Sequence, residues 1–438
     1  MQRPSADRAT RRVTTQCAAL TVAALVIQST ANAQAPAISR AAPQAIAPGQ
    51  TTDVVLTGSN LAGATSLWTS FGEAASLAPD VENNGQDAGR VVFRVSAPAE
   101  NSLGIHGIRV VTPGGVSSLK LFVVDDLPTV AEAGGNNAPE SAQAVALPCA
   151  IDGQVDNLSR DYFRFDTAAG QKVSFEILAR RLGSPLDASL YLYRTDGREL
   201  HFVDDTAGLS SDCQFAYTFE EAGSYIIEVR DIQYTGGGNY LYRLRMGDFP
   251  CISTPVPLAA QRGTTTEIAF AGADVDGAAP ASLTIPADSQ ADWVKISTRR
   301  PGGMSSGFAA VQVSAGVEFL EQEPNDAPEQ ANAINIGDSV NGRFEQAGDM
   351  DRFAFDAKQG QRFVFAGISR QVGAPSDLML RIYGPAGNQV AAVDDNGAAE
   401  GSLNYAFPAD GRYTLAVHDL NRRGGPEYSY RVAVAPHE

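Results

Sequence analysis

The sequence is poor in the side chains that most often carry catalysis or bind metals through nitrogen and sulfur. Its 438 residues include four histidines, four cysteines and two tryptophans. No H-E-x-x-H zinc motif, phosphate-binding glycine loop or C-x-x-C pair is present. A G-x-S-x-G pattern occurs around Ser305, but it lacks the preceding strand and the following helix of a nucleophile elbow. We therefore expect no catalytic residues and no cofactor-binding motif.

Positive charge and long apolar runs are also scarce. The formal net charge is −17 at pH 7, with 50 acidic residues against 33 Lys and Arg. A surface with this excess of acid argues against binding to nucleic acid or to an anionic membrane, and it is compatible with divalent cations. After residue 33 no stretch is long and apolar enough to predict a transmembrane helix.

The first 33 residues are typical of a secretory signal peptide. A basic start, "MQRPSADRATRR", precedes the apolar run "CAALTVAALVI", and "STANA" ends in small residues that predict cleavage after Ala33. The apolar run is too short for a stable membrane-spanning helix. We expect the mature protein to be secreted, or to lie in the periplasm or at the cell surface. Its net charge would be −20, because the peptide carries four Arg and one Asp.

Three cysteines follow the predicted cleavage site, and export would allow a disulfide bond. Cys149 and Cys251 each follow a proline and lie near the two ends of one predicted domain. We therefore expect a Cys149–Cys251 disulfide, with Cys213 left over. The alternative is that all three are unpaired and partly buried thiols.

A long internal repeat organises the chain. The segment "DYFRFDTAAGQKVSF" from Asp161 matches "DRFAFDAKQGQRFVF" from Asp351, a shift of 190 residues, and "EEAGSYIIEVRD" matches "PADGRYTLAVHD" at a shift of 188. In both copies apolar and polar residues alternate, as in antiparallel sheets with one buried face, and turns containing Gly and Asp separate the runs. Each copy has about 110 residues, which fits a β-sandwich or jelly roll.

Two further segments precede the copies. Each begins with a proline-containing lead, a glycine turn and an alternating strand, as in small immunoglobulin-like sandwiches. We therefore expect an all-β fold, a four-domain array of β-sandwiches in which two domains are Ig-like and two are jelly-roll-like. The expected order is signal peptide 1–33, Ig-like domain 34–127, first repeat 128–248, second Ig-like domain 249–320 and second repeat 321–438.

The repeats and the first Ig-like segment resemble known families. The first repeat, with D-Y-F-R-F, R-R-L-G-S-P-L-D, A-G-S-Y-I-I-E-V-R-D and G-G-G-N-Y-L-Y-R-L, resembles the bacterial pre-peptidase C-terminal (PPC) domain, as does the second. Residues 34–127 resemble an IPT/TIG-type Ig-like domain, from P-G-Q through L-T-G-S-N-L to V-T-P-G-G-V-S. The resemblance implies extracellular β-sandwich modules without catalytic residues, found beside secreted proteases and in long exported proteins. Some members of the family bind collagen or polysaccharide, and some carry calcium.

The second repeat opens on an acidic segment, "FLEQEPNDAPEQA", at residues 319–331. Residues two apart in an extended chain share a face, so Glu321, Glu323 and Asn325 should point the same way, next to Asp326. An acidic pair with the same spacing, in "GDMDRF", begins the next predicted strand. Five carboxylates and one amide oxygen would suit calcium, which takes about six to eight oxygen ligands. The resemblance to calcium-carrying relatives implies the same ligand set: Glu321, Glu323, Asn325, Asp326, Asp349 and Asp351.

The first repeat lacks most of this acid. Gly134, Asn137 and Ser159 replace three of the five carboxylates, and Glu132 and Asp161 remain. Fewer charged ligands mean weaker calcium binding. We therefore expect calcium in the second repeat and little or none in the first.

A helix cap is a competing interpretation of the N-[DN]-A-P-E core that both repeats share. Asp326 and Asn137 each precede a glutamate by three residues, with a proline between them, as in a capping box at the start of a helix. This interpretation does not explain Glu321, Glu323 or Asp349. The cap and the calcium site can therefore both be present.

Two other groups of residues are candidates for function. The doublets Asp204-Asp205 and Asp394-Asp395 recur in the two repeats. They predict a second cation site, a catalytic carboxylate pair or, as we favour, turns in which the carboxylates accept loop amides. Tyrosines cluster in the first repeat, and they predict either a surface that binds protein or glycan or, as we favour, ordinary cross-strand pairs. These are Tyr191, Tyr193, Tyr234, Tyr240 and Tyr242.

Together these observations predict a secreted, non-catalytic protein that binds or adheres to a matrix protein, a glycan or an envelope partner, with calcium stabilising the second repeat. We expect no nucleic-acid partner and no membrane span. Two alternatives stay open: a structural spacer or envelope component without a specific ligand, and a secreted hydrolase or protease-associated accessory protein.

Overall fold

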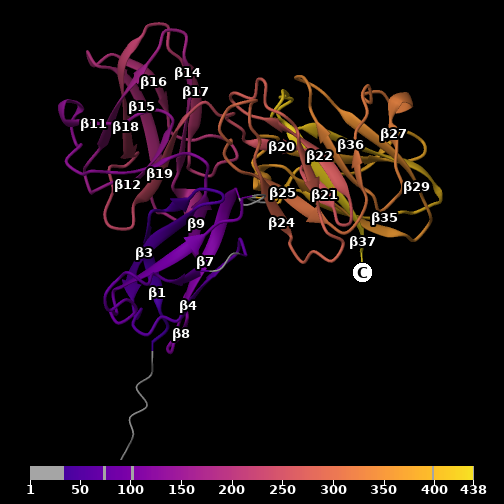
Figure 1. Cartoon of the computed structure of the whole chain (residues 1–438). Coiled ribbons are helices and arrows are strands. Elements are labelled where there is room, and N and C mark those ends of the chain that lie inside the picture. Colours follow the sequence, from indigo (N-terminus) through magenta and orange to yellow (C-terminus); the bar gives the residue numbers. More distant parts are fainter. Residues whose placement is uncertain (1–33, 73–74, 100–102, 397–398, 438) are drawn as a thin grey trace, which may run out of the picture. The chain divides into compact units, whose positions relative to one another are not determined.

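The computed structural model describes residues 34–72, 75–99, 103–396 and 399–437 (Figure 1). The predicted signal peptide lies outside these residues. Within them every regular element is a β-strand or a short 3-10 turn, so the predicted all-β fold of several sandwiches is confirmed. None of the helices in this part of the chain is long and apolar enough to cross a membrane.

Residues 37–124 form two facing sheets. The first has the order β1 (Ala37–Ala42), β3 (Thr51–Ser59), β6 (Arg90–Ser96), β5 (Ala75–Leu77). The second has the order β2 (Ala45–Ile46), β9 (Lys120–Val124), β7 (Gly104–Thr112), β4 (Ser66–Thr69), and β8 (Gly115–Val116) pairs with β7. Val54, Phe93 and Phe122 lie in the core between the sheets.

The first repeat consists of two five-stranded sheets. One has the order β10 (Thr129–Ala131), β12 (Cys149–Gln154), β19 (Leu241–Gly247), β14 (Lys172–Leu178), β17 (Gln214–Thr218). The other has the order β11 (Gln143–Ala144), β13 (Asp161–Thr167), β18 (Gly223–Asp231), β15 (Ala188–Arg194), β16 (Glu199–Val203). Two 3-10 turns, η1 (Pro139–Ser141) and η2 (Arg180–Leu182), lie between strands.

The second repeat has the same strand order. One sheet runs β26 (Glu318–Leu320), β28 (Ser339–Arg343), β37 (Ser429–Pro436), β30 (Arg362–Ile368), β35 (Ser402–Ala406). The other runs β27 (Asn332–Ala333), β29 (Asp351–Ala357), β36 (Gly411–Asp419), β31 (Leu378–Tyr383), β32 (Gln389–Val393). The turns η3 (Pro328–Gln330) and η4 (Arg370–Val372) occupy the equivalent places, and β33 (Asp395–Asn396) pairs with β34 (Ala399–Glu400).

Period-two patterning explains these sheets. In β13, Phe163 and Phe165 are buried while Arg164 and Asp166 are exposed, because successive side chains of a strand point to opposite faces. The aromatic cores of the two repeats match: the ring centroids of Phe165 and Phe175 lie 5.6 Å apart. The distance between the counterparts of these two rings, Phe355 and Phe365, is 5.9 Å.

The segment between the repeats forms two three-stranded sheets around a smaller core. Their orders are β20 (Thr254–Val256), β22 (Thr265–Ala271), β23 (Ala281–Thr284) and β21 (Ala259–Gln261), β25 (Ala309–Ser314), β24 (Trp293–Ile296). Ile268, Ile285 and Val311 are buried in this core.

A network of buried ion pairs surrounds two arginines of β19. Arg243 Nε lies 3.0 Å from Asp125 Oδ2, and Arg243 Nη1 lies 2.7 Å from Asp152 Oδ1. Arg245 Nη2 lies 3.2 Å from Asp125 Oδ1, and Arg245 Nη1 lies 2.5 Å from Glu176 Oε2. Asp125, which follows β9, thereby joins the end of the first sandwich to the first repeat. Each of these charges is buried and paired, as buried charges must be to be tolerated.

The predicted disulfide between Cys149 and Cys251 is wrong. The three cysteines of the described residues are free and buried. Cys149 and Cys213 face the core of the first repeat, whereas Cys251 packs in a separate cluster with Phe249, so the two thiols do not face one another. Burial raises the pKa of Cys149 to about 11 and that of Cys251 to about 12. The alternative of three unpaired thiols describes the structure.

Candidate metal centre

The acidic segment of the second repeat folds against the start of β29. Its first residue, Glu321, directly follows β26 and donates its backbone N–H to Asn341 O at 3.0 Å. This bond continues the parallel pairing of β26 with β28 and turns the next residues toward Asp351, the first residue of β29. Glu321, Glu323 and Asp351 each offer a carboxylate oxygen, and these oxygens lie within 4.8 Å of one another. The fold thus brings together acidic groups that could hold a metal ion.

Two polar side chains beside this cluster are buried and have no hydrogen-bond partner. Asn325 is 0% exposed, and neither its amide oxygen nor its amide nitrogen forms a hydrogen bond. Asp351 is also 0% exposed, and both of its carboxylate oxygens lack a hydrogen bond. Buried polar groups in folded proteins are almost always satisfied, because an unpaired one costs about 1–3 kcal/mol and more if charged. The acceptor oxygens of both residues are therefore available to a ligand.

Glu321 is held in place by its neighbours. Its Oε1 accepts a hydrogen bond from the backbone N–H of Arg343 at 2.5 Å, and its Oε2 accepts one from the Tyr430 hydroxyl at 3.0 Å. A side chain at Gly342 would collide with both the Glu321 carboxylate and the Tyr430 hydroxyl. Glycine at this position therefore allows the carboxylate to pack onto β28.

The other predicted ligands lie around the opening of the cluster. Asp349 and Asp326 each accept a hydrogen bond from the backbone N–H of Met350, at 3.0 and 3.1 Å, so their carboxylates converge on one amide. Glu323 is exposed and accepts the backbone N–H of Asn325 at 2.9 Å. Each of these carboxylates keeps further lone pairs free for a cation.

The electrostatics of the cluster favour the binding of a cation. Burial, together with the neighbouring Glu321 charge, raises the pKa of Asp351 to about 10. Burial also raises the pKa of Glu321 to about 7 and shifts that of Asp349 upward. None of the ion pairs formed by the described residues involves these carboxylates. Ionised together, they repel one another in a poorly solvated site, and a bound cation would relieve that repulsion.

The first repeat keeps the inner half of this arrangement and loses the outer half. Glu132 Oε2 accepts the backbone N–H of Gln154 at 2.9 Å, as its counterpart Glu321 accepts that of Arg343. The Tyr242 hydroxyl, the counterpart of that of Tyr430, donates to Asp161 Oδ2 at 3.0 Å. At the opening, however, Asn137 Nδ2 donates to Ser159 Oγ at 2.5 Å. A neutral amide–hydroxyl bond thus stands where the second repeat has two carboxylates.

The predicted capping boxes are displaced by one residue. The N-cap residues of η1 and η3 are Ala138 and Ala327, followed by the expected proline. Their backbone N–H groups donate to Ser141 Oγ at 3.2 Å and to Gln330 Oε1 at 3.1 Å. The prediction that Asn137 and Asp326 act as caps is therefore wrong, because these turns start one residue later. Both side chains are left for contacts with the segment that precedes β13 or β29.

A second acidic group in this repeat already contains a cation. Asp377, Asp395 and Glu400 lie close enough to share a metal ion. Arg370 occupies that place, with nitrogens 3.5 Å from Asp377, 2.5 Å from Asp395 and 2.6 Å from Glu400. Asp394 accepts the backbone N–H of the next residue at 2.8 Å, as favoured from the sequence for the doublets.

Ser305, at the centre of the G-x-S-x-G pattern, is 1% exposed. Its hydroxyl donates to Asp126 Oδ2 at 2.7 Å, and its backbone N–H donates to the same carboxylate. The residue forms an isolated β-bridge with Arg299. Ser305 therefore lies in a β-environment, and its hydroxyl proton is engaged by the carboxylate.

No known family pattern and no curated protein matches the chain. Parts of it are similar to solved structures. The pre-peptidase C-terminal domain of collagenase from Bacillus anthracis is 19% identical over 25% of this chain and 100% of its own, with a TM-score of 0.21. PliG from Aeromonas hydrophila, a periplasmic inhibitor of g-type lysozyme, is 20% identical over 28% of this chain and 96% of its own, with a TM-score of 0.20. SGBP-B from Bacteroides ovatus, solved with a mixed-linkage heptasaccharide, is 10% identical over 88% of this chain and 74% of its own, with a TM-score of 0.19.

Proposed function

We propose that the protein is a secreted, non-catalytic binding protein whose second repeat holds one calcium ion. The observation that carries the calcium assignment is the pair of buried side chains without partners, Asn325 and Asp351, beside the carboxylate of Glu321. An amide oxygen and carboxylates are hard ligands, which suit calcium better than zinc or copper. The residues that would supply oxygen are Glu321, Glu323, Asn325, Asp326, Asp349 and Asp351.

In this proposal calcium has a structural role. Glu321, Glu323 and Asn325 belong to the segment that leads into the repeat, whereas Asp349 and Asp351 belong to the start of β29. Oxygen ligands from both segments would fix one against the other and neutralise carboxylates that otherwise repel. The bound state would therefore order the start of the repeat and raise its stability by RT ln(1 + [Ca]/Kd), about 2.7 kcal/mol at a hundredfold excess over Kd.

Calcium titration of the mature chain, residues 34–438, tests this assignment. After removal of divalent ions with EGTA, calorimetry should give one calcium per chain, and calcium should raise the melting temperature. Asp351→Asn should abolish both effects, while the matched Asp161→Asn in the first repeat should keep them. A wild-type protein that gives neither heat nor a thermal shift would rule the site out.

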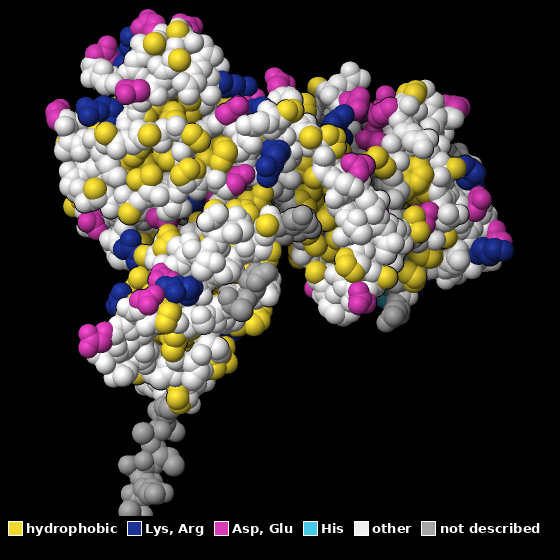
Figure 2. All heavy atoms as spheres, viewed as in Figure 1, with side chains coloured by type: hydrophobic (Ala, Val, Ile, Leu, Met, Phe, Trp, Pro, Cys, Tyr) yellow, Lys and Arg dark blue, Asp and Glu magenta, His cyan; other side chains and the backbone are white. Residues whose placement is uncertain are grey.

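In this proposal the charged surface is that of an exported protein. Figure 2 shows acidic side chains scattered over the visible face, with Lys and Arg among them, as expected for a soluble extracellular protein whose mature form would carry a net charge of −20. A glycan and matrix-protein array probed with the mature chain tests this role, and we expect at least one class of ligand to be retained. An array without any specific signal would instead support the alternative of a structural spacer. The buried pairing of Asp125 with Arg243 and Arg245 favours that alternative, because it joins the first sandwich to the first repeat.

A further inference from the structure

Four side chains form a row across the outer face of the second sheet of the first repeat. Strand register places Tyr162 of β13 opposite Glu228 of β18, Glu228 opposite Tyr191 of β15, and Tyr191 opposite Phe202 of β16. Residues directly opposite one another in antiparallel strands project to the same face. The rings of Tyr191 and Phe202 lie 4.4 Å apart between centroids, and Phe202 is 40% exposed.

The second repeat has nothing similar at the same register positions. There Arg352 pairs with Ala416, Ala416 with Arg381, and Arg381 with Ala392. The sandwich therefore forms equally well with arginine and alanine in this row. The Tyr-Glu-Tyr-Phe row is a property of the first repeat and is not required by the fold.

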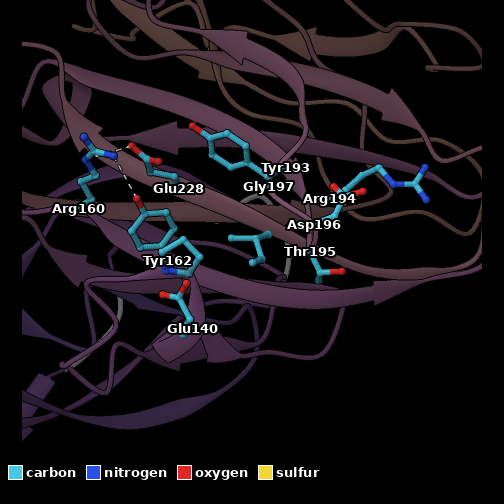
Figure 3. A pocket seen from close by; sticks show the side chains of 11 residues that line it. Glu140, Arg160, Tyr162, Tyr193, Arg194, Thr195, Asp196, Gly197 and Glu228 are labelled. Atoms are coloured by element: carbon cyan, nitrogen blue, oxygen red, sulfur yellow. Dashed lines mark hydrogen bonds and ion pairs between the residues drawn. The ribbon is translucent and has the colours of Figure 1, made fainter.

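A pocket of about 340 Å³ opens beside this row (Figure 3). Tyr162, Tyr193, Ile226 and Pro139 contribute ring and apolar surface, and the turn from Thr195 to Gly197 also lines the pocket. The volume falls within the range of small-molecule sites in proteins, ~300–1,000 Å³. Its mixed aromatic and polar lining suits a ligand with an apolar face and a polar edge.

Glu228 supplies the pocket with an open acceptor. The residue is 1% exposed, and its Oε1 forms no hydrogen bond. The nearest cationic nitrogens are Arg230 Nη1 at 3.4 Å and Arg160 Nε at 3.8 Å. In Figure 3 the Glu228 carboxylate points toward Arg160. A ligand hydroxyl placed here would give this oxygen a hydrogen bond, in addition to its two ion pairs with arginine.

The surrounding charges select a neutral ligand. A cationic group would meet the guanidinium groups of Arg160 and Arg230, which already flank Glu228, and that of Arg194, which also lines the pocket. An anionic group would meet Glu228 itself and the rim carboxylates of Glu140 and Asp196. A neutral hydroxyl avoids both conflicts, because it can donate to Glu228 and accept from Arg160.

We propose that this pocket binds one ring of a neutral glycan, with Tyr193 and Tyr162 against the apolar face of the sugar and Glu228 and Arg160 bonded to its hydroxyl groups. The inference rests on the proposed function as a binding protein and names the ligand class and the site. A sugar ring combines a face of C–H groups with a rim of donors and acceptors, which is the combination that the pocket lining complements.

The pocket is organised before any ligand enters. Arg160 donates to Tyr162 Oη at 3.3 Å and to Tyr234 Oη at 3.0 Å, and Arg230 donates to the hydroxyls of Tyr191 and Tyr234. The Arg230 guanidinium also lies 4.2 Å from the centroid of the Tyr191 ring. Side chains fixed in this way lose little conformational freedom on binding, which favours affinity.

Calorimetric titration of the calcium-loaded mature chain with tetrasaccharides tests the proposal. The probes are the β-1,4-linked glucose, β-1,4-linked mannose, β-1,3-linked glucose and α-1,4-linked glucose tetramers, with tetragalacturonate as an acidic control. Free glucose and mannose distinguish a site for monosaccharides from one for chains. We expect at least one neutral tetramer to bind, and tetragalacturonate to bind at least about tenfold more weakly.

Matched variants locate the site. Tyr193→Ala should weaken binding about tenfold or more through loss of the ring, and Tyr193→Phe should retain most of it. The counterpart in the second repeat, Tyr383→Ala, should leave binding unchanged. Glu228→Gln keeps the shape of the side chain and should also weaken binding, with thermal unfolding measured to confirm that each variant is folded.

Three outcomes would overturn the proposal: no neutral tetramer binds at about 1 mM, tetragalacturonate binds best, or Tyr383→Ala weakens binding as much as Tyr193→Ala. If the array retains a matrix protein while no neutral sugar binds, the proposed binding function stands and the glycan pocket falls. If neither experiment gives a signal, both fall.

Discussion

Calcium binding to the second repeat should release protons, and the number is set by two carboxyl groups. Burial raises the pKa of Asp351 to about 10 and that of Glu321 to about 7. Without calcium at pH 7, this coupled pair therefore holds between about one and two protons in total. Calcium requires the ionised forms, so binding expels these protons.

The linkage fixes the slope of affinity against pH. Near pH 7 the association constant should rise more than about tenfold per pH unit, corresponding to between about one and two protons released. The slope should be steeper near pH 6, where about two protons leave, and shallower near pH 8, where about one leaves. Calorimetry in two buffers of different ionisation enthalpy measures the released protons directly at each pH.

A proton release of zero between pH 6 and pH 8 would refute this reasoning, because it would mean that both carboxyl groups are already ionised in the calcium-free protein. Glu321→Gln provides the control. It removes one of the two coupled carboxyl groups, so the release near pH 6 should fall from about two protons to about one.

Three further predictions concern stability and gain of function. In EDTA, the wild type should lose stability relative to Asp351→Asn as the pH rises from about 4 to about 10, because a carboxyl with a raised pKa binds its proton more tightly in the folded state. Thermal unfolding of both proteins across this range checks the prediction, and a wild type that gains stability relative to the variant would contradict it. Asp125→Asn should destabilise the protein by about 3–5 kcal/mol in urea unfolding, because it leaves two buried arginines without their shared partner, whereas Asp53→Asn at the exposed pair with Arg94 should change little. Restoring acid to the first repeat with Asn137→Asp and Ser159→Asp should create weak calcium binding, detected as a second site in calorimetry; an unchanged stoichiometry of one would show that the missing acid at Gly134 is decisive.

Local periodicity explains which parts of the site could be predicted. Glu321 and Glu323 are two residues apart, and the structure brings their carboxylates together with that of Asp351. Asn325 is fully buried whereas Glu323 is exposed, so period-two spacing does not describe the whole segment. The alternating runs of both repeats predicted strands by the same period-two rule, and the matching copies supplied independent support for each. Sequence spacing could not show that Tyr430 bonds to Glu321, because that contact depends on the pairing of β28 with β37 across the length of the repeat.

The failures have related causes. The cap prediction was wrong by one residue because a 3-10 turn of three residues can start at Ala138 as readily as at Asn137. The disulfide was predicted from position near the domain ends, but pairing depends on the direction of the side chains, and Cys149 points into a different cluster from Cys251. The row through Glu228 could not be predicted, because it depends on how β13, β18 and β15 pair, and these strands are far apart in the sequence.

The buried pairs of Asp125 have a consequence for the order in which the chain is made. The two partners of Asp125 come much later in the chain: Arg243 follows it by 118 residues and Arg245 by 120 residues. During synthesis from the N-terminus, the first sandwich therefore carries an exposed acid at its end until nearly the whole first repeat has emerged. Only the last strand of that repeat, β19, brings the two arginines that neutralise it. Ser305, which bonds both Asp126 and Arg245, follows still later in the chain. The junction is therefore complete only after the segment between the two repeats has also been made.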